Sequence, residues 1–173
     1  MGGAAAGLQI DSVTDDALWA LTQRLVTTDC SFRLASDFVA EVAFPRVSAL
    51  SSTASRPLLR TCQWLGKHQP KAVQSQLLLP LLVDPAMGSA QAELVLRSVK
   101  ESPAPLVQEL LEGALGEAPP PPWGEPLLHT WHSVLGLRLA LPAAAVLHRL
   151  LELLEPQLEA QKTSQKYCNL LFA

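Results

Sequence analysis

The chain has 173 residues, of which 49% are hydrophobic and 17% are charged, and its net charge is −3. This length and apolar content exclude an intrinsically disordered protein, and the acidic balance with scattered Lys and Arg argues against autonomous nucleic-acid binding. Leu supplies about a fifth of the residues, whereas Ile occurs once and aromatic residues make up 5%. Because Leu and Ala favour helices while strands prefer β-branched and aromatic residues, the composition predicts an all-α protein.

Apolar residues recur at intervals of three and four along the chain, and Pro, Gly and Ser/Thr punctuate them. This pattern predicts about nine helices, which begin near residues 14, 36, 52, 70, 89, 102, 127, 142 and 163. In the first helix Thr14 is the expected N-cap, and the predicted inner face is Leu18, Leu21 and Leu25. Ser36 is expected to cap the second helix.

The later helices carry comparable signals. Pro45 is predicted to disturb the end of the second helix, Gly66 to end the third, and Pro80 to kink the fourth. The run of residues 118–122, which is Ala followed by four prolines, is predicted to be a short stiff spacer. No stretch has the 18–20 uninterrupted apolar residues of a membrane span.

The spacing of the helices predicts an architecture. Two helices with their turns make a unit of roughly 35–40 residues, which is typical of HEAT- and armadillo-like repeats. We therefore predict an α-solenoid of antiparallel helix pairs over residues 14–173, preceded by a disordered tail over residues 1–13. A solenoid needs a polar terminal cap, and residues 171–173 lack one, so the domain is expected to be truncated at its C-terminal end.

No catalytic motif is found, and no cofactor, metal or small-molecule site is predicted. The three cysteines, Cys30, Cys62 and Cys168, form no paired motif and suit a reducing compartment as free thiols. One alternative function remains open. His129 and His132 lie three residues apart in a predicted helix, and with Glu125 they could serve a small helical enzyme or ligand-binding bundle.

Two sets of residues are candidates for partner binding. Arg46 follows Pro45 at the end of the second predicted helix, where it could bond the last free carbonyls of that helix. Tyr167, Leu171 and Phe172 lie in the last predicted helix, whose apolar face would have no following helix to cover it.

Several segments resemble one protein family. Residues 44–60 (FPRVSALSSTASRPLLR), 88–94 (GSAQAEL), 99–102 (VKES) and 163–171 (TSQKYCNLL) are similar, in order and spacing, to the C-terminal helical domain of Fanconi anaemia group E proteins. The similarity extends over most of residues 15–173, and the Ser/Thr-rich segment is its most specific part.

The resemblance implies a non-catalytic α-solenoid adaptor in the nucleus. It implies a subunit of the Fanconi core complex, a ubiquitin ligase of DNA interstrand crosslink repair. The E subunit of that complex joins the C and F subunits and bridges the ligase to its substrate, the D2 protein. On this basis Arg46 would help to fix the turn or the adjoining surface used by the C subunit.

Overall fold

The computed structural model describes residues 13–117, 123–135 and 152, and 78% of these residues are helical, with no strand among them. The all-α prediction is therefore confirmed. Seven continuous helices lie within residues 13–117 and 123–135, where about nine were predicted for the whole chain. Apart from Glu152, the predicted helices that begin near residues 142 and 163 lie outside the described residues. Their bounds are α1 (Asp15–Leu25), α2–η2–α3 (Phe32–Phe38, Val39–Ala43, Phe44–Ser48), α4 (Arg56–His68), α5–η3–α6 (Pro70–Val73, Gln74–Leu78, Leu79–Leu82), α7 (Ser89–Glu101), α8 (Ala104–Glu117) and α9 (Glu125–Leu135).

Three helices begin at a hydroxyl side chain that accepts a backbone N–H from the first turn. Thr14, Ser31 and Ser55 cap α1, α2 and α4, with oxygen–nitrogen distances of 3.2–3.3 Å. The prediction that Ser36 begins the second helix was wrong, because Ser31 caps it and Ser36 lies buried inside it. Gly66 does not end α4, which continues to His68. Glycine alone is a weak stop signal when the turn that follows can still form its hydrogen bonds.

Two prolines lie inside continuous helices, each directly after a widened turn. The N–H of Phe44 bonds the carbonyl of Val39, five residues back, immediately before Pro45. In the later helix the same bond joins Leu79 to Gln74, immediately before Pro80. A proline ring has no N–H and clashes with the preceding turn, and a π-helical turn gives it room. The chain therefore stays helical through both prolines, which lie 35 residues apart.

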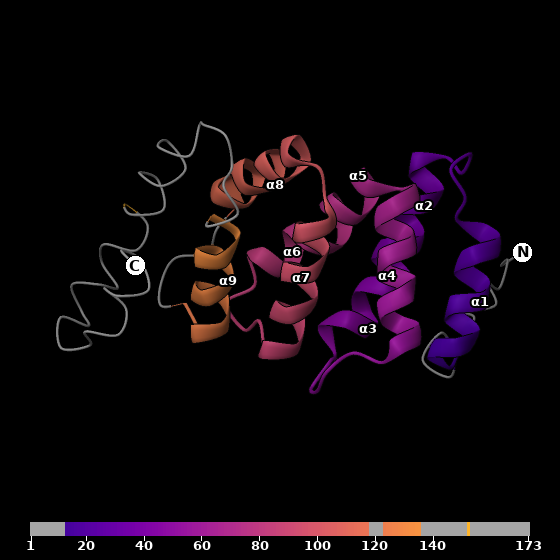
Figure 1. Cartoon of the computed structure of the whole chain (residues 1–173), viewed down its shortest axis with the longest axis horizontal. Coiled ribbons are helices and arrows are strands. Elements are labelled where there is room, and N and C mark those ends of the chain that lie inside the picture. The colour runs from indigo at the N-terminus through magenta and orange to yellow at the C-terminus, as the bar shows by residue number, and fades with distance from the viewer. Residues whose placement is uncertain (1–12, 118–122, 136–151, 153–173) are drawn as a thin grey trace, which may run out of the picture.

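The helices pack in two series along the long axis of the molecule (Figure 1). In one series α1 contacts α4, α4 contacts α7, and α7 contacts α9. In the other α2 contacts α5, η2 contacts η3, and both η3 and α6 contact α8. The core lies between them and consists mainly of Leu, Val and Ala. No helix in the described part of the chain is long and apolar enough for a membrane span.

The inner face of α1 differs from the prediction. Leu18 is buried, but Leu21 and Leu25 are 42% and 48% exposed, and Thr22 and Val26 are buried instead. Thr22 can be buried because its hydroxyl donates to the carbonyl of Leu18 at 2.8 Å, so its polar group is satisfied within the helix. The buried residues therefore recur at intervals of four, along a stripe rotated away from the two exposed leucines.

Candidate interaction surfaces

Arg46 joins α3 to the start of α1. Its guanidinium lies 3.0 Å from the Asp15 carboxylate and also donates to the backbone carbonyl of Val13. The two side chains are 17% and 31% exposed, so the ion pair is partly shielded from water. Both of these contacts join Arg46 to residues more than 30 positions earlier in the chain.

Asp15 also binds the start of α4. Its second carboxylate oxygen accepts a hydrogen bond from the hydroxyl of Ser55, and that hydroxyl in turn accepts the N–H of Leu58 as the N-cap of α4. Asp15 lies in the first turn of α1, where a negative charge is favoured by the helix dipole. The Asp15 carboxylate therefore links the starts of α1 and α4 to Arg46 of α3. Ser55 belongs to the Ser/Thr-rich segment within residues 44–60 that resembles the family.

The turn between α1 and α2 is held by side chains at the end of α4. The indole N–H of Trp64 donates to the carbonyl of Val26 at 2.8 Å. The amide of Gln69 donates to the carbonyls of Thr27 and Cys30, both at 3.0 Å. These bonds replace the partners that backbone groups lose where a helix ends. The turn is thus fixed to the body of the molecule.

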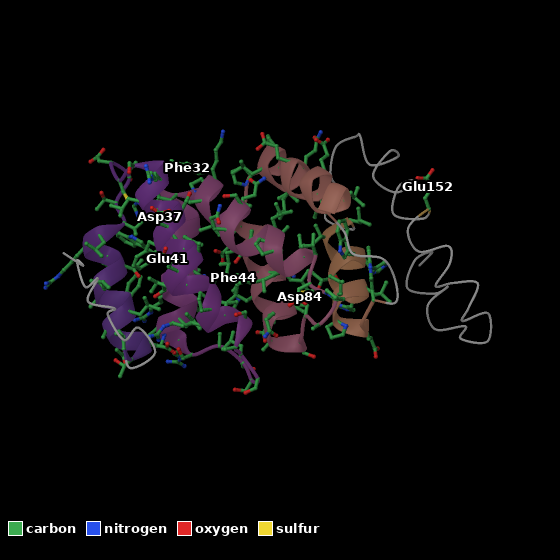
Figure 2. The ribbon with its side chains drawn as sticks, turned by 180° about the vertical axis from the view of Figure 1, so that it is seen from behind. Phe32, Asp37, Glu41, Phe44, Asp84 and Glu152 are labelled. Atoms are coloured by element: carbon green, nitrogen blue, oxygen red, sulfur yellow. The ribbon has the colours of Figure 1, made fainter. Side chains whose placement is uncertain are left out.

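Four large hydrophobic side chains are exposed on the two helices beside this turn. Their exposed fractions lie between 42% and 55%, and they are Leu21, Leu25, Phe32 and Leu34. Figure 2 shows Phe32 at the start of α2, at the end of the molecule where α1 lies. Leu21 and Leu25 lie one turn apart on α1, and exposed apolar side chains that gather on one face are typical of a protein interface. We name these four residues the α1–α2 surface, which the sequence analysis missed because it placed Leu21 and Leu25 in the core.

A second glutamine side chain, Gln91, holds another turn in place. Gln91 on α7 is 7% exposed, and its amide donates to the carbonyls of Ser48 and Leu50 at 2.9 and 2.8 Å. These carbonyls belong to the turn that follows α3. This role could not be predicted from the sequence, because a glutamine in a helix is ordinarily a solvated residue.

A cleft of about 330 Å³ lies where the end of α4, the α5–η3 segment, the end of α7 and the start of α8 meet. Cys62 lines it and is 4% exposed. Burial, together with the negative charge of Asp15, raises the pKa of the Cys62 thiol to about 12. A thiol with this pKa stays protonated at neutral pH and is a poor nucleophile.

The residues of the alternative function lie on α9. His129 is exposed and His132 is half-buried, while Glu125 is the first residue of the helix. Within residues 13–117, 123–135 and 152, no three His, Cys, Asp or Glu side chains gather closely enough to hold a metal ion. Tyr167, Leu171 and Phe172, the other predicted partner-binding residues, lie outside the described residues.

Comparison with known families gives a direct result. The model of the Fanconi anaemia group E protein FANCE matches residues 1–173, the whole chain. The chain belongs to the Fanconi anaemia group E family. A comparison with curated proteins gives no match. Membership makes the chain a Fanconi core complex component with a role in DNA repair, and it confirms the family resemblance seen in the sequence.

Proposed function

We propose that the chain is a non-catalytic adaptor that works in the nucleus. In this proposal it joins the C and F subunits of the Fanconi core complex and links the ligase to its substrate D2 for monoubiquitination. The observation that carries the proposal is the family match over all 173 residues. The helix packing supports it, because the two series of contacts fit an α-solenoid, an architecture that presents long surfaces to large partners.

The α1–α2 surface is the proposed contact for one of these three proteins. Its four side chains are exposed, yet the turn between their helices is fixed by Trp64 and Gln69. A rigid apolar surface loses little conformational entropy when a partner binds, so more of the burial energy is available for affinity.

Arg46 is proposed to act as a positioning residue for the C subunit. Its side chain is 17% exposed and is engaged with α1, so it would act by holding α1 and the Ser/Thr-rich segment in place. Arg46→Trp should keep the helical content of the chain but weaken its binding to the C protein. Arg60→Trp, at an exposed arginine of α4, is the matched control. If the Arg46→Trp variant is folded and binds the C protein as tightly as the wild-type chain does, Arg46 is not a positioning residue for the C subunit.

The adaptor proposal is tested by pairwise binding of the purified chain to the Fanconi C, F and D2 proteins. We expect binding to at least C and D2. Phe32→Asp should weaken binding to one of the three proteins at least tenfold. An exposed aromatic side chain that becomes buried when a partner binds commonly supplies much of the binding energy. Arg33→Asp, a charge change at the neighbouring exposed residue, is the control. If the wild-type chain binds none of the three proteins, the proposal is wrong.

A further inference from the structure

We infer that the exposed faces of α4 and α7 together bind the phosphate backbone of duplex DNA. These two helices carry five exposed basic side chains, which are Arg56, Arg60, Lys67, Arg97 and Lys100. We name this set the α4–α7 basic face. The inference goes beyond the proposed adaptor function, because it adds a contact with nucleic acid to the contacts with proteins.

Helical geometry places the basic residues of α4 on one stripe. Arg56, Arg60 and Lys67 follow one another at intervals of four and seven residues, so each returns to the same side of the helix. All three are exposed, whereas Leu58 and Leu65 on the opposite side are buried. The helix has no acidic residue, so the stripe carries three positive charges and no negative one.

The helix α7 brings two more basic residues beside this stripe. The two helices contact each other (Figure 1), and the amide of Gln63, which lies on the α4 stripe, donates to the Glu101 carboxylate at 3.0 Å. Arg97 lies one turn before Glu101 on α7, and Lys100 is the residue next to it. The basic residues of the two helices therefore adjoin.

Most of these cations have no carboxylate to neutralise them. Arg97 lies 3.9 Å from Glu93, and both of these side chains are about half exposed. Among the described residues no carboxylate forms an ion pair with the other four members of the face, Arg56, Arg60, Lys67 and Lys100. Their charges are available to a ligand, and a polyanion that binds them gains free energy by releasing its condensed counterions.

The acidic net charge of the chain does not describe this face. Exposed acidic residues lie on α2–η2 and α8 of the other series of helices, and they are Asp37, Glu41, Glu109 and Glu112 (Figure 2 shows the first two). The helix α8 has no basic residue. The net charge of −3 therefore argues against tight binding by the chain as a whole, but a local field of one sign still attracts an anionic ligand.

The chemistry of the face favours a nucleic acid over a protein. Among the described residues, the large hydrophobic side chains that are exposed are the four of the α1–α2 surface, and none lies on α4 or α7. Protein interfaces ordinarily have an apolar core, whereas phosphate contacts come from arginine, lysine and amide side chains. The stripe on α4 is about 16 Å long, which matches about five nucleotides along one strand of a duplex. The role of the family in DNA repair makes DNA the polyanion to test.

The contact is tested by fluorescence anisotropy, with the 173-residue chain and a short labelled DNA duplex at about 50 mM salt. If the four unpaired basic residues each neutralise one phosphate, the slope of log K against log salt concentration is about −3.6, and threefold higher salt weakens binding roughly 50-fold. Two duplexes of unrelated sequence should bind equally, because phosphate contacts carry no sequence information.

Variants locate the contact on the molecule. Arg60→Gln should weaken binding severalfold and make the salt slope shallower by about 1. Arg33→Gln is the matched control, because it removes the same charge from an exposed arginine on α2, and it should stay within twofold of wild type. Arg60→Glu combined with Lys67→Glu should lose at least tenfold in affinity for DNA. This double variant should keep its thermal midpoint and its binding to the C and D2 proteins, because both side chains are exposed.

Three results would overturn the inference. The first is no DNA binding by the wild-type chain at about 50 mM salt. The second is an equal loss for Arg60→Gln and Arg33→Gln, because the charge of the whole chain would then set the affinity. The third is a double variant that keeps its affinity for DNA but loses at least tenfold for the C or D2 protein, which would make the face a protein interface. Each of these results leaves the adaptor function standing, since that function fails only if the wild-type chain binds none of the C, F and D2 proteins.

Discussion

Truncation of two leucines on the same helix measures which face of α1 is buried. Leu18 is fully buried, whereas Leu21 is 42% exposed. Leu18→Ala removes a fully covered side chain and leaves a cavity, so we expect the free energy of unfolding to fall by about 2–5 kcal/mol. For Leu21→Ala we expect the free energy of unfolding to fall by only about 0.5–1.5 kcal/mol. Full burial of a leucine side chain contributes about 1.5–3 kcal/mol, and much of the Leu21 side chain remains in water.

Urea unfolding followed by tryptophan fluorescence is the assay for this pair. The rings of Trp19 on α1 and Trp64 on α4 pack edge to face with their centres 5.8 Å apart, so two of the four tryptophans sense the attachment of α1. For a chain of this length, a loss of about 3 kcal/mol corresponds to a fall in Tm of roughly 6–12 °C. Equal losses for the two variants would refute the packing of α1 described above.

Three further predictions concern the hydrogen bonds and the buried thiol. Asp15→Ala and Arg46→Ala should each lower the free energy of unfolding by about 1–3 kcal/mol. The loss for the double variant should be smaller than the sum of the two single losses, and this difference, the coupling energy of a double-mutant cycle, should be about 1–2 kcal/mol. Strict additivity would show that the ion pair contributes nothing. Gln91→Leu should cost about 1–3 kcal/mol in the same urea assay, because it leaves two carbonyls of the turn after α3 without their donor. For Cys62 the folded pKa of about 12 lies above the ordinary value of 9.0, so its contribution to stability is complete below pH 9 and declines as pH rises toward 12. Urea midpoints between pH 9 and 12 should therefore fall more steeply for the wild-type chain than for Cys62→Ala, and parallel profiles would contradict the burial of this thiol.

The helices could be predicted because their signals are local. Thr14 and Pro70 each stand at the helix start that the sequence indicated, and apolar residues at intervals of three and four mark the helical segments between them. The orientation of α1 could not be predicted in the same way. Hydrophobicity alone favours Leu21 over Thr22 for the core. In the structure α1 is held by the packing of Trp19 against Trp64 and by the bond that Arg46 donates to Asp15, and Thr22 faces inward.

The candidate surfaces depended on contacts that no local pattern reveals. Arg46 was identified as a notable residue, but its partner Asp15 lies 31 positions earlier and on another helix. The cleft lies between four elements that are separate in the sequence, so its lining could not be predicted before their packing was known. The sequence therefore predicted the helices and the family, while the surfaces required the packing of one helix against another.

The most direct test of the adaptor function is whether the chain bridges two partners at once. Size-exclusion chromatography with light scattering can compare a mixture of the C and D2 proteins with the same mixture plus the 173-residue chain. The account predicts that C and D2 elute together, at the mass of a three-protein complex, when the chain is present, and that they elute separately when it is absent. Separate elution in both mixtures would contradict the central claim that the chain links these two proteins.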